Sequence, residues 1–465
     1  MKTLFTLLVL LFIANLSFAQ EKSLNYFLEA AQKNNPSLLQ NENLKRISGF
    51  ENQLITAENS TFHIDATSEV MVAPYFNNDG RFIAITTTPS PNAYGYAEPV
   101  SNGSLYSAQV NITKDIFNRS KVQNLLFQNK LNNKARELSN EEIIHQLQKN
   151  VTQAYIQVYQ LQLQQSLTKD LISDLENRLK VVEILVKKGI LMQSDYLLLQ
   201  LEIDQKKLQY QQMEINLNAN LLNLNNAVGI KNSEIQKLEA PLLPLDPQLK
   251  EYLSKGDIST KLSNFKDDSL DLKVKPLSIN SMNRIEPDSS QTFYKRKYKI
   301  DSLQLVSEQA VFNNKYKPQL TAYGNTGLNA VDANDIPHNF GFSAGLKLVV
   351  PIYDGGQKKI KELQKELRNE NLKVQLQNKE LIKQNTLESL QQQITGVYKG
   401  LVLIEKQLEK QRNIMEIYKG KMVQGQVSII DYLKVIENYK IDMETKLQMQ
   451  VNLWLLQNEY NATNW

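Results

Sequence analysis

The sequence contains one pattern written twice, 236 positions apart. Ile116-Phe117-Asn118 corresponds to Ile352-Tyr353-Asp354, and Gly189 followed by Asp195-Tyr196-Leu197 corresponds to Gly425 followed by Asp431-Tyr432-Leu433. The offset is constant over 73 residues, so the two copies have nearly equal arms. Repeats of this length indicate duplicated structural units that complete each other. We therefore predict two pseudo-equivalent halves rather than two different domains.

The first 19 residues have the pattern of a secretory signal. Lys2 precedes an apolar run from Leu4 to Ile13, and the small residues Ser17 and Ala19 lead to a predicted cleavage before Gln20. The run is shorter than the roughly 20 residues that a spanning helix requires, and no later segment supplies one. Because cysteine is absent from the sequence, we expect neither disulfides nor a lipid-modified amino-terminal cysteine. If the chain lies in a membrane, strands must hold it there.

Charge and motif content argue against nucleic-acid binding and catalysis. The net charge is +4, and basic and acidic residues are mixed along the chain. His63, His145 and His338 fall on a predicted strand, helix and loop, so we expect no metal site within one chain. There is no phosphate-binding glycine loop and no Gly-x-Ser-x-Gly motif. We predict a non-enzyme without a cofactor.

Four segments alternate between apolar and polar residues as strands do. A soluble sheet with one wet face fits any one of them equally well, but four of about 10 to 12 residues, with aromatic ends, favour tilted membrane strands. We predict strand hairpins at about 61–114 and 317–351. The long polar loop at 73–103 and the short one at 329–339 suit an extracellular side. The predicted apolar faces are Phe62, Ile64, Ala66, Ser68 and Val70; Tyr106, Ala108, Val110 and Ile112; Leu320, Ala322, Gly324, Thr326 and Leu328; and Phe340, Phe342, Ala344, Leu346, Leu348 and Val350.

A long helical pattern follows each strand pair. Residues 119–188 contain neither proline nor glycine and would extend about 100 Å as a helix. The second copy, 357–424, lacks proline but holds Gly396, Gly400 and Gly420, so we expect slight irregularity there. Each arm ends at a glycine turn and reverses, which predicts helical hairpins at about 119–229 and 357–465.

The predicted organisation is a signal peptide at 1–19, a first repeat at 20–230, a link at 231–290 and a second repeat at 291–465. The link is rich in Lys, Asp, Ser and Pro. Two interpretations remain open for it, some helical packing around the waist of the assembly or a disordered linker.

Four strands cannot close a barrel, and an open sheet edge is not tolerated in lipid. Membrane barrels start at about eight strands, so a dimer, a trimer or a larger ring must complete this one. Closing the sheet would place the helices in a second, coaxial barrel. The expected result is a long conduit.

Several motifs in this order resemble the outer-membrane efflux protein family, the TolC-like channels. They are Ala30 to Pro36, similar to the family's amino-terminal stretch, Lys317 to Leu320 at a strand entry, Gly345 to Gly356 at the strand-to-helix corner, and the two Gly-x5-Asp tips. The resemblance covers essentially the whole mature sequence. It implies a homotrimer with a 12-stranded β-barrel in the lipid of a Gram-negative outer membrane, continuous with a 12-helix periplasmic α-barrel.

The family resemblance also implies a function. The chain would be the passive exit duct of a tripartite efflux or type I secretion system, fed by a periplasmic adaptor and an inner-membrane pump. Neither the transported substrate nor the class of pump follows from the sequence. The alternatives are a periplasmic coiled-coil scaffold without a pore, and an adaptor subunit, although an adaptor would need one helical hairpin and small soluble β-domains.

Candidate gate residues lie near the tips. Asp195 and Asp431 fit helix caps, and Ser428 to Asp431 fits a capping box. The resemblance gives them a second role, with Asp195 helping to hold the tip closed and Asp431 in an acidic ring that favours cations. Where the family can carry a locking tyrosine and arginine, this chain has Met422 and Val427, and Lys434 stands where a second acid can sit. We therefore hypothesise an apolar constriction lined by Met422 or Val427.

The hairpin tips are also candidate docking sites. Gly189 and Gly425 can be simple turn glycines. The resemblance adds a role in docking the adaptor, for which we prefer the tip residues Lys188, Gly189, Ile190, Gln424, Gly425 and Gln426. Asp354, Gly355 and Gly356 form the strand-to-helix corner, to which we assign only a structural role, with Asp354 capping the helix.

Overall fold

The computed structural model describes residues 22–71, 73–86, 88–95, 106–231, 237–243, 292–330 and 333–465. The predicted signal peptide and most of the predicted link lie outside these ranges. The chain divides into two compact units. The first, here the helical unit, comprises Met1–Gln40, Ser139–Tyr294 and Gln377–Trp465, and the second, here the sheet unit, comprises Asn41–Leu138 and Lys295–Leu376.

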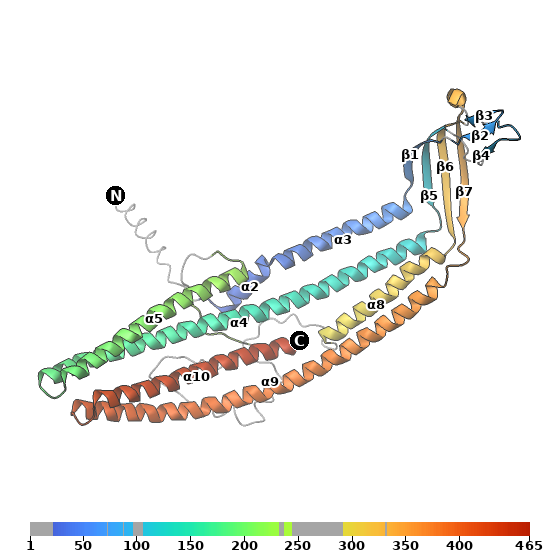
Figure 1. Ribbon diagram of the computed structural model, residues 1–465. Helices are drawn as coiled ribbons and strands as arrows, with labels where there is room; N and C mark the ends of the chain where they lie inside the picture. The colour runs from blue at the N-terminus through green and yellow to red at the C-terminus, as the bar shows by residue number, and fades with distance from the viewer. Residues whose placement is uncertain are drawn as a thin grey trace, which may run out of the picture. The chain divides into compact units, whose positions relative to one another are not determined.

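Two very long helices dominate the secondary structure (Figure 1). Helix α4 spans Arg119–Lys187, 69 residues, and α9 spans Gln357–Val423, 67 residues. The return arms are α5, Gln193–Val228, and α10, Ile429–Thr463. Helix α9 runs unbroken through its three glycines. Among the described residues, no helix has both the length and the hydropathy needed to cross a membrane.

Both long helices end in the same turn. At the first tip Gly189 N–H donates to the Val186 carbonyl and Ile190 N–H to that of Leu185, both at 2.9 Å. At the second tip Gly425 N–H donates to the Met422 carbonyl at 3.0 Å, and Gln426 N–H donates to that of Lys421 at 2.9 Å. This pair of bonds is the Schellman motif, which places one left-handed residue after the helix. Both glycines have φ of 72°, which explains why glycine occupies the two positions.

Three further helices precede the strand pairs, and our sequence prediction did not include them. They are α2, Leu24–Asn34, α3, Pro36–Ser60, and α8, Phe293–Asn313. Asn35 starts α3, since its Oδ1 accepts the backbone N–H of Ser37 at 2.9 Å, and Pro36 occupies the first helical position, where its missing N–H costs nothing.

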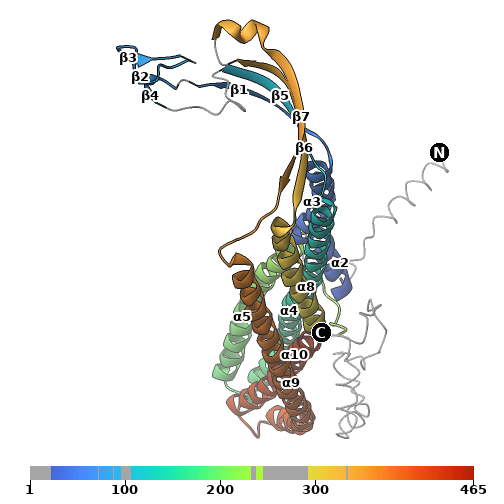
Figure 2. The ribbon, with the colours of Figure 1, turned by 90° about the vertical axis from the view of Figure 1, so that its right-hand side faces the viewer.

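The sheet unit contains a four-stranded antiparallel sheet in the order β1-β5-β6-β7 (Figure 1). Figure 2 shows the same sheet from its side. The strands are β1, His63–Val70, β5, Tyr106–Asp115, β6, Gln319–Ala330, and β7, Phe340–Val349. The two predicted hairpin pairings, β1 with β5 and β6 with β7, are present, and β5 pairs with β6 to join them. Strand β1 has eight residues, fewer than the expected ten to twelve.

The loops at the far end of the strands contain short elements. Within the predicted 73–103 loop, β2, Tyr75–Asn78, β3, Arg81–Ala84, and β4, Tyr94–Gly95, form a small sheet in the order β3-β2-β4. The shorter loop holds the 3₁₀ turn η2, Ala333–His338, and a similar turn η1, Asn314–Tyr316, leads into β6.

The described start of the predicted link packs on the helical unit. Residues 237–243 are extended, and Leu238 forms a parallel bridge with Lys22. The Tyr155 hydroxyl lies 2.8 Å from the carbonyl of Lys22 and 2.7 Å from that of Glu239, within donating distance of either. Leu238 and Leu243 are buried in a core with Phe27.

Candidate functional site at the helical tips and the sheet

The hairpin tips are joined by a core within the helical unit. All four helical arms contribute to it, with Leu175 and Val182 from α4, Leu199 and Ile203 from α5, Met422 from α9, and Ile429, Tyr432 and Ile436 from α10. Burial of these side chains ties the two copies of the repeat together at their turns.

The hypothesis that Met422 lines a constriction does not fit this core. Met422 is only 2% exposed and packs among the chain's own apolar side chains, so it is not on a surface that could face a passage. Val427 is half-buried against the same core, whereas Asp431 and Lys434 are exposed. Residues three apart on a helix lie on the same side, which places Lys434 near Asp431.

The capping interpretation of the two aspartates is confirmed. Asp195 Oδ2 accepts the backbone N–H of Met192 at 2.9 Å. In the second copy Asp431 N–H donates to Ser428 Oγ at 3.1 Å, and that hydroxyl donates to Asp431 Oδ2 at 2.7 Å. Each carboxylate also lies in the first turn of a return arm, where the helix dipole favours negative charge.

The predicted docking residues lie where a partner could reach them. All six tip residues are exposed. The tips also touch each other, because a Cβ placed on Gly425 would lie 3.2 Å from Ile190 Cγ2. A groove of about 310 Å³ lies between α5 and α10 near the tips, lined by Leu198, Leu201, Glu202, Gln205, Ile430 and Leu433.

A charged network behind the tips was not predicted from the sequence. Lys206 of α5 lies 3.0 Å from Glu202 and 3.5 Å from Glu437 of α10. Lys440, which is 9% exposed, lies 3.8 Å from Glu437 and 3.6 Å from Glu444. Burial by itself lowers the pKa of Lys206, but hydrogen bonding and the charges of Glu202 and Glu437 outweigh it and raise that pKa above 10.5. No short motif could reveal this network, because its two helices are separated by more than 200 residues.

The strand register unites the four predicted apolar faces into one. Ile64, Ile112, Gly324 and Ala344 are neighbours across the sheet, as are Ala66, Val110, Thr326 and Phe342. Large apolar side chains on this face are exposed in the chain, Phe342 at 88% and Leu346 at 67%.

The opposite face of the sheet is polar and hydrogen-bonded. Asn111 Nδ2 donates to Asp65 Oδ2 at 3.0 Å, and Thr321 Oγ1 donates to Asp115 Oδ1 at 2.8 Å. Tyr323 lies over Gly345, where a Cβ would come 2.6 Å from its hydroxyl oxygen. An apolar exposed face backed by a polar face is the arrangement of a membrane strand, with lipid on one side and water on the other.

A mainly helical chain with two long hairpins and such a sheet has the fold of the outer-membrane channel proteins. The outer membrane protein VceC from Vibrio cholerae has a similar structure, with a TM-score of 0.63 at 12% sequence identity. The match covers 95% of this chain and 96% of the VceC chain. CusC, whose structures describe transmembrane channel formation, matches 96% and 95%, with a TM-score of 0.64 at 11% identity.

The CmeC outer membrane channel from Campylobacter jejuni matches 95% of this chain and 83% of its own, with a TM-score of 0.58 at 15% identity. No protein family and no curated protein sequence matches the chain. At these identities the likeness establishes the fold. The predicted resemblance is therefore confirmed at the level of the fold, which this chain shares with the CmeC outer membrane channel, VceC and CusC.

Proposed function

We propose that this protein is the outer-membrane exit duct of an efflux or type I secretion system in a Gram-negative bacterium, conducting substrates passively to the exterior. The observation that carries the proposal is the exposed apolar face of the β1-β5-β6-β7 sheet, backed by a hydrogen-bonded polar face. Lipid would cover the apolar face, and the polar face would line a water-filled passage.

Assembly with other copies of the chain follows from the edges of the sheet. Strands β1 and β7 each pair on one side only within the described residues. The helices next to these edges carry exposed apolar stripes, Ile47, Phe50 and Leu54 on α3, and Ile360, Leu367 and Val374 on α9. Two different surfaces at opposite edges would give a head-to-tail contact between copies, which forms a ring where the rotation between them closes. The family resemblance favours a homotrimer with 12 strands and 12 helices around the tunnel.

The proposed gate uses the exposed side chains near the tips. Asp431 and Lys434 would face the narrow end of the tunnel, Val427 would be its apolar element, and Asp195 would help to hold the outer hairpin closed. Three copies of Asp431 around an axis would concentrate negative potential and favour cations.

The proposed partners are a periplasmic adaptor and, behind it, an inner-membrane pump. The adaptor would contact the six exposed tip residues around Gly189 and Gly425. The apolar groove between α5 and α10, with Leu201 and Ile430, lies beside these tips and offers a further contact. The chemistry that energises transport would belong to the pump.

Single-channel recording tests the proposal. The purified mature protein is placed in a planar bilayer and its current is recorded. In a second experiment, cysteines introduced on β1 and β7 are crosslinked between copies to count subunits. The sequence contains no cysteine that would interfere. Discrete, cation-favouring openings from a crosslinked trimer are expected. A protein that salt or urea washes from membranes and that does not conduct would instead be the alternative, a periplasmic scaffold or adaptor.

A further inference from the structure

The ends of the strands that face the helices carry a concentration of positive charge. Four segments of the sheet unit meet there, 58–62, 114–121, 315–317 and 354–361, and they contain eight basic and three acidic side chains. The whole chain is nearly balanced, with 53 basic and 49 acidic residues, so this excess is local. The eight basic residues are Lys114, Arg119, Lys121, Lys315, Lys317, Lys358, Lys359 and Lys361.

Two of the three acids are already engaged in local structure. Asp115 accepts the Thr321 hydroxyl on the polar face of the sheet. Asp354 caps α9 as predicted, accepting the backbone N–H groups of Gly356 and Lys358 at 2.8 Å each. These carboxylates are therefore held by neutral donors rather than by the surrounding lysines.

Lys114 marks where the apolar face ends. It follows Val110 and Ile112 on the apolar face of β5, and it pairs across the sheet with Ala322. Its Nζ lies 4.3 Å from the ring centre of Phe62, which is 62% exposed. A lysine at the end of an apolar face, with its stem over a ring, can extend its ammonium into the headgroup layer of a membrane.

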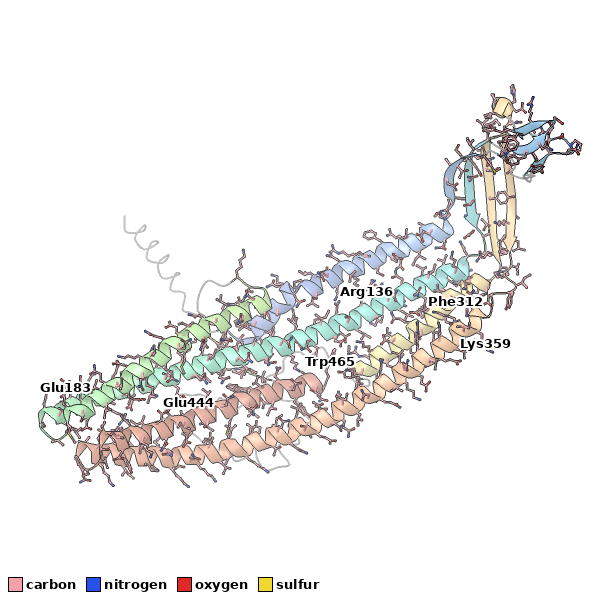
Figure 3. All side chains as sticks on the ribbon, viewed as in Figure 1. Arg136, Glu183, Phe312, Lys359, Glu444 and Trp465 are labelled. Carbon is pink, nitrogen blue, oxygen red and sulfur yellow. The ribbon has the colours of Figure 1, made fainter. Side chains whose placement is uncertain are left out.

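Aromatic and aliphatic side chains accompany the lysines. Phe117 is 64% exposed and Tyr353 is 88% exposed, at matching positions of the two repeats. Lys315 Nζ lies 3.8 Å from the ring centre of Phe312 and 3.1 Å from Gln357 Oε1. Figure 3 shows Phe312 and Lys359 where α8 and α9 approach the sheet. Aromatic rings with basic side chains are typical of the boundary between hydrocarbon and headgroups.

We propose that Lys114, Lys315, Lys317, Lys358, Lys359 and Lys361 form a basic rim that binds the phosphate groups of anionic phospholipids in the leaflet facing the helices. The inference rests on the proposed function, since it needs the sheet to lie in a bilayer. Bound lipid would set the height of the sheet in the membrane. Each basic side chain near an anionic surface contributes on the order of a fivefold gain in affinity.

Lipid retention tests the rim. The full mature protein is reconstituted in nanodiscs of phosphatidylcholine with or without phosphatidylglycerol, released into the gas phase, and its retained lipids are counted by native mass spectrometry. We expect selective retention of phosphatidylglycerol that weakens as NaCl rises. The variant K114Q/K315Q/K359Q should lose at least tenfold in phosphatidylglycerol affinity, whereas the control K399Q/K406Q/K410Q, with three exposed lysines further along α9, should match wild type.

Conductance on the same preparations separates this inference from the proposed function. If wild type conducts but retains both lipids equally, the basic rim is wrong and the proposed function stands. An equal loss of phosphatidylglycerol affinity in the control variant would also contradict the basic rim. If the protein shows no selective lipid retention but binds purified peptidoglycan in a way that depends on Lys114, the ligand of the basic rim is the cell wall, and the lipid proposal is wrong. If the triple variant does not assemble, the test uses the single variant K114Q and the salt dependence of phosphatidylglycerol retention by wild type. Retention that does not weaken as NaCl rises would contradict a phosphate contact.

Discussion

Arg178 of α4 lies over the ring of Tyr432 of α10, with its guanidinium carbon 4.9 Å from the ring centre. Arg178 Nε also donates to Asp174 at 2.5 Å, and Arg178 is 9% exposed. A cation over an aromatic face contributes about 0.5–2 kcal/mol, more when water is excluded. This contact links the hairpin of the first repeat to that of the second.

Tyr432 should contribute through its ring rather than its hydroxyl. It is fully buried, and its hydroxyl has no hydrogen-bond partner among the described residues. Tyr432→Ala should lower the free energy of local unfolding at the tips by about 3–5 kcal/mol, measured by hydrogen exchange of the α5 and α10 amides. Tyr432→Phe keeps the ring and should be neutral or slightly stabilising; a large loss in that variant would mean that the hydroxyl is used.

The Lys206 network should weaken only at alkaline pH. Because the folded-state pKa of Lys206 is raised, its stabilising effect is fully present below the unfolded value near about 10.4 and is lost as pH rises through the folded value. The melting temperature of wild type should therefore exceed that of Lys206→Met at pH 8, and the difference should shrink as the pH is raised above the unfolded value. Circular dichroism measures both melting temperatures. A difference that does not shrink at alkaline pH would show that packing of the side chain, not its charge, is responsible.

The two tip glycines form a matched pair. Each has a left-handed backbone, so alanine should cost about 1–2 kcal/mol at either position. A Cβ on Gly189 meets nothing within 4 Å, whereas one on Gly425 meets Ile190 at 3.2 Å. We expect Gly425→Ala to loosen the contact between the tips more than Gly189→Ala, as measured by hydrogen exchange at residues 186–196. Equal effects would mean that Ile190 moves aside without cost.

Asp431 should influence ion selectivity. Replacing it with Asn removes one negative charge per subunit from the proposed narrow end, so the permeability ratio of K⁺ to Cl⁻ should fall by about twofold or more. Lys434→Gln removes a nearby positive charge and should shift the ratio the other way. Bilayer recordings measure both. Higher conductance of Asp431→Asn with unchanged closure would count against an acidic latch.

The two faces of β7 should respond differently to charge. Phe342 lies on the apolar face and Ser343 on the polar face. Phe342→Lys should destabilise insertion by about 2–4 kcal/mol if the site is near the bilayer centre, and Ser343→Lys should be tolerated. Recovery of each variant in the outer-membrane fraction, together with urea titration in lipid, makes the comparison. If both variants are tolerated equally, lipid does not cover the apolar face.

Local pattern predicted much of the secondary structure. The period of two residues in the strands and the absence of glycine and proline from 119–188 follow from backbone geometry, and α4 begins and ends within one residue of the predicted bounds. The tip turns were predictable for the same reason, because a left-handed residue at a helix end favours glycine whatever surrounds it. Helices α3 and α8 were missed, although the spacing of Ile47, Phe50 and Leu54 is helical and was available as a signal.

The amino-acid pattern alone predicts the long helices, their turns and the alternating strands, because these depend on neighbours within a few residues, and it shows directly the duplication that relates them. Which surfaces meet is set by the tertiary structure. It united four strand faces into one, buried Met422 instead of leaving it exposed, and brought Arg178 to Tyr432. Such pairings depend on the register and packing of segments up to about 250 residues apart, which no local period encodes.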